Sequence, residues 1–480
     1  MADILFTHSY FLRFDPKQWR AQQPFAPLAT ITAAATLREI GHSVALYDPM
    51  FAEQAEEILP ALKKHQPKLL VVYDDGFNYL TKMCLTNMRE AAFEVFEMAK
   101  AFGCKVLVSS SDATDHSLEY LQKGADFVLV GEGEQTLTEL STALLSGEED
   151  FEAIAGLRFL AEGQLRSTKP RINLKELDQI PLPAWDLVNI EDYKQRWISS
   201  KGFFSINLST TRGCPFKCNW CAKPIYGNRY NARSPENVID ELKLLKQRYN
   251  FDHVWFCDDI FGLKPGWVKR FADLVEAENL DFKFKIQSRA DLLLEENNIA
   301  DLARAGADEI WIGAESGSQK VLDAMDKGTS VEQIVEATRL MKKHNIKPCY
   351  FLQFGYPGET FEDIKLTFDL VFKQMPHDIG VSVSYPLPGT KFYDNVKSEL
   401  GAKSNWTDSD ELLVMFDSTF PAEFYKKLQR YVHYEFRLRA LKNKLSENRG
   451  GLDSLSLISK LLYRIPLSIW SKQQLNKYVR

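Results

Sequence analysis

The chain has 480 residues, of which 45% are hydrophobic and 26% charged, and it carries a net charge of −6 and seven cysteines. This composition is that of a globular protein with a large core, and its acidic balance argues against nucleic acid as the main partner, because phosphate binding needs a basic surface. No secretory signal and no run of 18 apolar residues is visible, so we expect a cytoplasmic protein without a spanning helix, whose clustered thiols bind metal or act in catalysis.

Residues 1–150 alternate short apolar runs with helical patterns. The runs suit parallel strands that are buried on both faces, and they are Ile4–Thr7, Val44–Tyr47, Leu69–Tyr73, Lys105–Val108 and Phe127–Val130. Helical patterns at Leu28–Ile40 and Asn87–Phe102 both end before a glycine, which is a common helix terminus. The alternation predicts a doubly wound, flavodoxin-like α/β domain, in which ligands bind beyond the carboxyl ends of the strands.

Residues 151–200 break this rhythm with several prolines, and we interpret them as a linker. A second βα series over 201–395 has expected strands at Ile206–Thr211, His253–Cys257, Phe282–Ser288, Glu309–Ala314, Pro348–Gly355 and Gly380–Tyr385. Six βα units are too few for an eight-stranded barrel, so we predict a partial (β/α)6 barrel with its chemistry at the C-terminal ends of the strands. Residues 396–480 are predicted to form a helical C-terminal cap.

Three cysteines, Cys214, Cys218 and Cys221, lie within eight residues, directly after a predicted strand. Pro215 makes a regular helix through them improbable, so a loop can wrap around a metal centre. Thiolates are the usual ligands of iron–sulfur clusters, and three of them leave the fourth iron of a [4Fe–4S] cluster open to a small molecule. A structural zinc site is the alternative, and it would need Cys257 as a fourth thiol.

The spacing Cys-x3-Cys-x2-Cys, with an aromatic residue before the last cysteine, resembles the signature of radical S-adenosylmethionine (SAM) enzymes. The resemblance implies that the open iron binds SAM, and that an electron from a donor such as flavodoxin or ferredoxin cleaves it to a 5′-deoxyadenosyl radical. It also implies that residues around the cluster and at the later strand ends contact SAM, namely Trp220, Asp258, Asp259, Arg289, Glu315 and Ser316. An acidic loop pair at 258–259 and a surface ion pair at Arg289 stay open as alternatives.

A strand followed by Gly131–Glu134 and a helix is similar to the cobalamin-binding modules that are fused to radical SAM enzymes. This resemblance implies cobalamin contacts at the strand ends of residues 1–150, namely Ser9, Tyr10, Tyr73, Asp74, Asp75, Ser109, Ser110, Gly131, Glu132, Gly133 and Glu134. The glycines are expected to let the backbone approach a bulky ligand. The Asp-x-His-x-x-Gly motif that gives cobalt a histidine elsewhere is absent, which argues against a histidine–cobalt bond and leaves open a domain that has lost the cofactor.

The resemblance covers almost the whole chain and implies an enzyme with both cofactors. Its commonest reaction is methyl transfer to an unactivated carbon, in which one SAM methylates cob(I)alamin and a second supplies the radical. A cobalamin-associated cyclase, oxidase or rearrangement enzyme without methyl transfer is the alternative, and a non-catalytic cobalamin or SAM binding module is the alternative of another class. The expected substrate is a small molecule, and the apolar tail slightly favours a hydrophobic or lipid one.

The tail itself mixes apolar and basic residues. Leu452–Trp470 carries Leu, Ile, Tyr and Trp together with Lys460 and Arg464. Such a segment resembles an interfacial amphipathic helix that contacts a membrane peripherally. A helix docked on the barrel or on a second subunit is the favoured alternative.

Overall fold

The computed structural model describes the chain except residues 75, 77–84, 296, 402, 404, 448–452 and 479–480, and it describes the backbone alone at 447 and 453–455. Two compact units divide the chain. Unit 1 comprises Met1–Phe216, Ala222–Ile286 and Asn405–Glu411, and unit 2 comprises Lys217–Cys221, Gln287–Ser404 and Leu412–Arg480. The division predicted from the sequence, with boundaries near 150, 200 and 395, stays a prediction.

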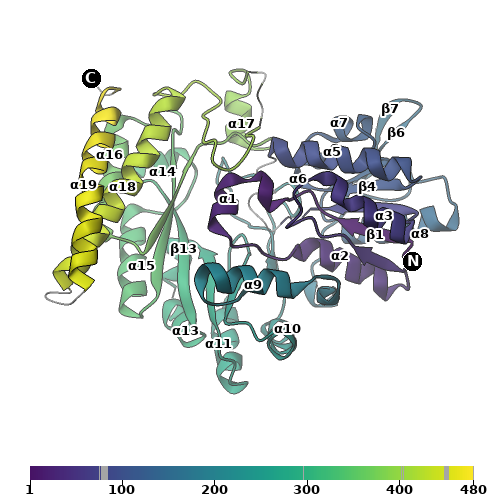
Figure 1. The fold of residues 1–480 in the computed structure, drawn as a ribbon, viewed down its shortest axis with the longest axis horizontal. Coiled ribbons are helices and arrows are strands. Elements are labelled where there is room, and N and C mark those ends of the chain that lie inside the picture. Colours follow the sequence, from purple (N-terminus) through teal and green to yellow (C-terminus); the bar gives the residue numbers. More distant parts are fainter. Residues whose placement is uncertain are drawn as a thin grey trace. The chain divides into compact units, whose positions relative to one another are not determined.

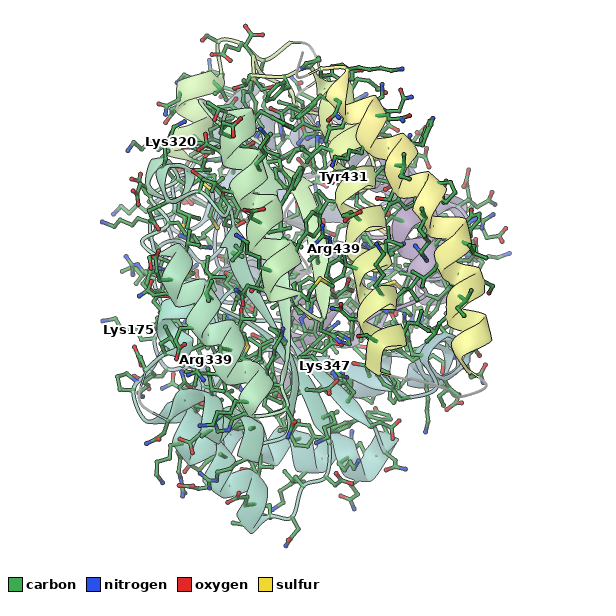
Figure 2. The ribbon with its side chains drawn as sticks, turned by 90° about the vertical axis from the view of Figure 1, so that its left-hand side faces the viewer. Lys175, Lys320, Arg339, Lys347, Tyr431 and Arg439 are labelled. Atoms are coloured by element: carbon green, nitrogen blue, oxygen red, sulfur yellow. The ribbon has the colours of Figure 1, made fainter. Side chains whose placement is uncertain are left out.

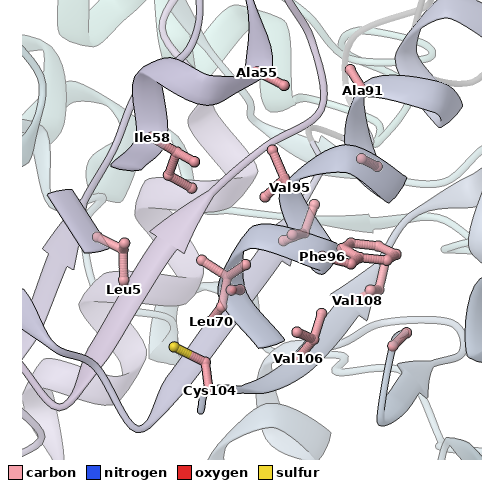
Figure 3. Packing of buried hydrophobic residues seen from close by; sticks show 14 of the residues in the cluster. Leu5, Ala55, Ile58, Leu70, Ala91, Val95, Phe96, Cys104, Val106 and Val108 are labelled. Atoms are coloured by element: carbon pink, nitrogen blue, oxygen red, sulfur yellow. The ribbon is translucent and has the colours of Figure 1, made fainter. Parts of the chain in front are cut away.

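Unit 1 contains a seven-stranded sheet in the order β2-β1-β3-β4-β5-β6-β7. Its first five strands are parallel and are β1 (Ile4–Thr7), β2 (Val44–Leu46), β3 (Leu69–Tyr73), β4 (Lys105–Ser109) and β5 (Phe127–Leu129). The predicted α/β fold with a parallel sheet is confirmed, and the order 2-1-3-4-5 is that of flavodoxin-like sheets. Figure 3 shows Leu70, Val106 and Val108 of this sheet packed with Phe96 in a buried cluster.

Two antiparallel strands extend this sheet, β6 (Leu157–Ala161) and β7 (Gln164–Ser167). They lie within residues 151–200, the predicted linker. Phe159 of β6 lies 5.8 Å from the ring of Phe127, and Phe151 lies 4.9 Å from the same ring, so an aromatic contact fastens the hairpin to β5. All four residues of β7 are exposed, so the sequence of this strand contains no apolar run from which it could be predicted.

The helical segments of unit 1 lie between and after these strands. They are η1 (Leu12–Phe14), α1 (Pro16–Ala21), α2 (Leu28–Glu39), η2 (Ala55–Ile58), α3 (Leu59–His65), α5 (Thr86–Ala101), α6 (Ser111–Asp115), α7 (Ser117–Gln122), α8 (Glu134–Ser146), η3 (Leu177–Gln179), η4 (Trp185–Leu187), α9 (Ile190–Lys201), α10 (Pro235–Tyr249) and α11 (Trp267–Ala277). The predicted helices Leu28–Ile40 and Asn87–Phe102 are confirmed as α2 and α5.

A second sheet has six strands in sequence order. They are β8 (Ser205–Leu208), β11 (His253–Phe256), β12 (Lys283–Ser288), β13 (Ala307–Glu315), β14 (Lys347–Phe354) and β15 (Asp378–Val383). β8, β11 and β12 pair in parallel, as do β13, β14 and β15. The six predicted strands are therefore confirmed. A two-stranded hairpin, β9 (Thr211–Arg212) and β10 (Asn231–Ala232), brackets the three cysteines in the sequence.

The helices of unit 2 follow its strands. They are α12 (Ala290–Leu293), α13 (Asn298–Arg304), α14 (Gln319–Ala324), α15 (Val331–Lys343), α16 (Phe361–Gln374), α17 (Lys391–Val396), α18 (Ala422–Glu447) and α19 (Asp453–Asn476). Capping boxes start two of them, because the side chains of Ser330 and Thr360 bond the backbone three residues on. Figure 1 shows α18 and α19 running side by side. None of the described helices is long and apolar enough to span a bilayer.

Candidate active site

The carboxyl ends of β3 and β4 open into a small cavity of unit 1. This strand-end cavity is small and partly open to solvent, and it is lined by Ala29, Tyr73, Asp74, Gly76, Ser109, Ser110, Ser111, Ile225 and Tyr226. The strand order reverses at β1 and β3, and ligands of doubly wound sheets bind at such a switch point. The structure thus brings four of the predicted cobalamin contacts, Tyr73, Asp74, Ser109 and Ser110, to one cavity.

Two further predicted contacts, Ser9 and Tyr10, follow β1 and are buried. Ser9 donates hydrogen bonds from its backbone N and its Oγ to the two carboxylate oxygens of Asp74, at 2.7 and 2.8 Å. Burial raises the pKa of Asp74, and the hydrogen bonds from Ser9 oppose that rise. Burial also raises the pKa of Tyr10. The predicted contact Asp75 lies outside the described residues.

His8 at the end of β1 has both ring nitrogens engaged. Its Nε2 lies 3.0 Å from Oδ1 of Asp48, and its Nδ1 accepts a hydrogen bond from the backbone N of Tyr10 at 3.2 Å. Tyr193 donates to the other oxygen of Asp48 at 2.6 Å. Burial alone would raise the pKa of Asp48, but hydrogen bonds and the His8 ring lower it. This network engages both ring nitrogens of His8 within the protein.

The glycines after β5 serve the protein's own packing. Gly131 has a φ of 79°, which favours glycine. At Gly133 a Cβ atom would lie 2.7 Å from the Tyr73 hydroxyl and 2.9 Å from Ser109 Oγ. Gly133 therefore makes room for two side chains that line the strand-end cavity, and its predicted contact with cobalamin stays a prediction.

The two glutamates of the same motif point at a single arginine. Glu132 and Glu134 are buried and both form ion pairs with the guanidinium of Arg212, the latter at 2.7 Å. Glu132 also accepts from the backbone N of Leu174 at 2.6 Å, and Arg212 lies 5.3 Å from the ring centroid of Tyr226. Burial would lower the pKa of Arg212, but Glu134, Tyr226 and Glu132 raise it. The motif thus binds the residue that stands two positions before Cys214.

Asp258 holds the backbone that leads into the cysteine loop. It is fully buried, and Oδ1 accepts from the backbone N of Thr210 at 2.7 Å and of Thr211 at 2.9 Å. Its Oδ2 accepts from the Thr210 hydroxyl at 2.5 Å. Burial raises the pKa of Asp258 to about 6 against these hydrogen bonds. These contacts use both oxygens within the protein, whereas its neighbour Asp259 is exposed.

In unit 2, cationic side chains surround Cys218. Nη1 of Arg289 lies 3.9 Å from its Sγ, and the Nζ of Lys327 lies 6.0 Å from the ring centroid of Trp220. Burial would lower the pKa of Lys327, but Glu315 and Cys218 raise it. The indole Nε1 of Trp220 is buried and has no acceptor in the described part of the chain. Positive charge therefore lies beside the sulfur of Cys218.

The end of β13 supplies the anchor for Lys327. Its Nζ donates to Oε1 of Glu315 at 2.8 Å, and a Cβ at Gly313 would collide with both groups. Ser316 is fully buried, and its Oγ lies 3.1 Å from Thr367 Oγ1. The structure therefore places Glu315 beside the Cys218 region and engages Ser316 within the protein.

The donor set of the loop fits an iron–sulfur cluster. Cys214, Cys218 and Cys221 are half-buried, and thiols of this number and spacing can supply three ligands. No three His, Cys, Asp or Glu side chains of the described residues are already placed as a metal-binding group.

Residues 208–371, from β8 into α16, match the radical SAM superfamily. This segment is a radical SAM domain. It contains the three cysteines, the cationic residues Arg289 and Lys327, and Glu315. The sequence prediction of the family is confirmed.

Relatives and a solved structure extend the likeness beyond the radical SAM domain. An uncharacterized methyltransferase of Pyrococcus horikoshii is 28% identical over 86% of this chain and 88% of its own length. An anaerobic magnesium-protoporphyrin IX monomethyl ester cyclase of Synechocystis sp. is 25% identical over 68% of this chain, which spans 64% of that relative. The structure of the radical SAM methyltransferase TsrM from Kitasatospora setae, with cobalamin and a [4Fe–4S] cluster bound, matches with a TM-score of 0.69 at 18% identity, over 83% of this chain and 75% of TsrM. At that identity the likeness shows the fold.

Two residues of the site were not among the predicted contacts. They are Lys327 of the radical SAM domain, which pairs with Glu315, and Arg212, which pairs with Glu132 and Glu134. A buried lysine or arginine needs an acidic or hydrogen-bonding partner. A single cation in a segment of apolar or small residues is therefore the sequence signal that could have identified these two residues.

Glu359, in the loop after β14 of the radical SAM domain, gives a pH prediction. Its Oε2 accepts from the backbone N of Gly355 at 2.6 Å, and burial raises its pKa to about 8. A raised carboxyl pKa stabilises the fold below the unfolded value near 4.5, and this contribution is lost as pH rises through about 8. We expect Glu359→Gln to raise the free energy of unfolding by about 2–5 kcal/mol at alkaline pH and to flatten its fall with pH.

Denaturant unfolding of the two proteins across this pH range measures the effect. Glu362→Gln is the matched control, since Glu362 lies on the same loop–helix junction with a side chain 77% exposed. An equal pH slope for wild type and Glu359→Gln contradicts the assignment.

Proposed function

We propose that the protein is a cobalamin-dependent radical SAM methyltransferase that acts on an unactivated carbon of a small molecule. The observation that carries the proposal is the presence, in one chain, of a radical SAM domain and, before it, a flavodoxin-like sheet with Gly131–Glu134 after β5. The likeness to TsrM and the methyltransferase named in Pyrococcus horikoshii support it. The reaction would proceed in a partial (β/α)6 barrel formed by the second sheet.

In the radical SAM domain, Cys214, Cys218 and Cys221 would hold the [4Fe–4S] cluster. The cluster and SAM, when bound at this loop, would supply the radical chemistry of the reaction. Arg289 and Lys327 provide positive charge beside Cys218, which stabilises an anionic cluster and attracts the carboxylate of SAM. Trp220 and Asp259 are further proposed SAM contacts, whereas Asp258 and Ser316 act through the loops that they bind.

In unit 1, the strand-end cavity offers hydroxyl groups from Tyr73, Ser109 and Ser110 and the phenol of Tyr226 for part of a cobalamin. Cobalamin supplies a transferable methyl group when it is bound. His8 would keep its hydrogen bonds with Asp48 and the Tyr10 backbone when cobalamin is bound.

Two partners complete the proposal. An electron donor such as flavodoxin or ferredoxin reduces the cluster, and the substrate is a small molecule, with a hydrophobic or lipid substrate favoured by the apolar C-terminal helix. A cytoplasmic location belongs to the same proposal.

A second candidate function is a cobalamin-associated radical cyclisation without methyl transfer. The similarity to the Synechocystis sp. cyclase favours it. Both reactions use the same cluster and the same proposed SAM contacts, so the product separates them.

We expect the reconstituted chain, incubated anaerobically with a reductant, SAM and a small-molecule extract, to form 5′-deoxyadenosine and a product that has gained one CH2. With methyl-deuterated SAM the product carries the label, and mass spectrometry detects it. Deoxyadenosine with an unlabelled, altered substrate establishes the cyclase alternative instead. Cobalamin or SAM binding without either product establishes a binding module and overturns the enzyme.

A further inference from the structure

Helix α19 is buried on one face and apolar on the other. Leu461, Ser468, Ser471 and Leu475 point inward, and Ser468 donates to Glu435 of α18 at 2.7 Å. The outward face carries six large apolar side chains that are exposed, namely Ile458, Leu462, Tyr463, Ile465, Ile469 and Trp470. Six of the seventeen strongly exposed large apolar side chains of the described residues thus lie on one helix.

These side chains form a continuous stripe. Ile458, Leu462, Ile465 and Ile469 recur at helical spacing on one face, and Tyr463 and Trp470, seven residues apart, lie beside them. Leu462 and Tyr463 are 68% and 71% exposed, so the helix does not hide them against unit 2. An apolar patch of this kind marks a surface that binds something.

The charge of the helical pair selects the partner. α18 and α19 contain ten Lys and Arg against four Asp and Glu, a net charge of +6, whereas the whole chain carries −6. Lys460, Arg464 and Lys472 accompany the apolar stripe along α19. Figure 2 shows the two helices adjacent on unit 2, with Arg439 on α18. A two-fold contact between two copies through this surface would bring like charges together, which is unfavourable.

We propose that α19 is a docking surface for an anionic lipid bilayer, on which it lies flat. The apolar stripe enters the boundary between head groups and acyl chains, with Tyr463 and Trp470 at the level where aromatic side chains gather, while the basic side chains reach the lipid phosphates. No described helix can cross the bilayer, so contact is at the surface. α18, which packs on α16 and β15, holds α19 to the rest of unit 2.

Co-sedimentation of the cluster-reconstituted full chain with vesicles tests this inference. We expect binding to vesicles of phosphatidylcholine with phosphatidylserine, weaker binding to phosphatidylcholine alone, and loss of binding as salt is raised. Leu462→Ser combined with Trp470→Ser should weaken binding by about 100-fold, because both side chains leave the apolar phase. Lys460→Gln combined with Lys472→Gln should remove the preference for anionic lipid.

Leu118→Ser combined with Ile198→Ser is the matched control, since both side chains are about half exposed elsewhere on the chain. This variant should bind as the wild type does. The proposal is overturned if Leu462→Ser/Trp470→Ser binds vesicles as strongly as the wild type. It is also overturned if the wild type does not bind vesicles but forms a dimer, and Leu462→Ser/Trp470→Ser does not form that dimer. Formation of 5′-deoxyadenosine by all variants keeps the test separate from the proposed catalytic function.

Discussion

Replacing Cys218 with alanine will lower the formation of 5′-deoxyadenosine by more than about 100-fold. The reason is the loss of one of three thiolates, in a loop where Arg289 lies 3.9 Å from the Cys218 sulfur. Removal of a residue that only supports a metal ligand would cause a smaller loss. Iron analysis after anaerobic reconstitution should show about four irons per wild-type chain and a clear deficit in the variant, with loss of the reduced-cluster signal in electron paramagnetic resonance.

Cys257→Ser is the matched control for this experiment. The Cys257 thiol is buried and donates to the Leu208 carbonyl at 3.1 Å, a hydrogen bond that a serine hydroxyl can replace. The iron content and activity of Cys257→Ser should equal those of the wild type. A structural zinc site would be established instead if the wild type contains zinc and no iron, and if both Cys257→Ser and Cys218→Ala lose that zinc.

The strands and the family could be predicted because their signals are local. Parallel strands buried on both faces produce unbroken apolar runs, such as Leu69–Tyr73. The three cysteines that indicate an iron–sulfur cluster lie within eight residues of one another. The prediction was poorer where a strand has no buried face. Gln164–Ser167 is wholly exposed and has no apolar periodicity, so the sequence predicts a linker where the β6–β7 hairpin lies.

The partners of charged residues could not be predicted, because they join distant parts of the sequence. Arg212 and Glu132 are 80 residues apart, and Asp258 meets Thr210 across 48 residues. Nothing local tells whether a carboxylate after a strand faces a ligand or another part of the chain. The predicted role of Glu132 and Glu134 as cobalamin contacts therefore has a competing structural assignment, their ion pairs with Arg212.

Neutralising both partners of Arg212, with Glu132→Gln and Glu134→Gln together, should destabilise the protein by about 3–5 kcal/mol. Arg212 has a side chain only 6% exposed, and without the two carboxylates its charge stays buried with hydrogen bonds to amide oxygens alone. The surface pair of Arg38 and Asp186 is the matched control, with nitrogen–oxygen distances of 2.9 Å and both side chains largely exposed. Asp186→Asn should cost less than about 1 kcal/mol.

A third variant separates the buried charge from the shape of the site. Adding Arg212→Met to the two glutamine substitutions removes the charge that was left unpaired, so it should restore most of the stability measured by denaturant unfolding. Because Arg212 stands two residues before Cys214, the double glutamine variant should also retain less iron after reconstitution than Asp186→Asn. If the triple variant is as unstable as the double, the loss comes from packing around Tyr226 and Gly133 and the ion pairs are not its cause. If iron retention is unchanged while stability falls, the Glu132–Arg212–Glu134 network supports unit 1 without holding the cluster loop.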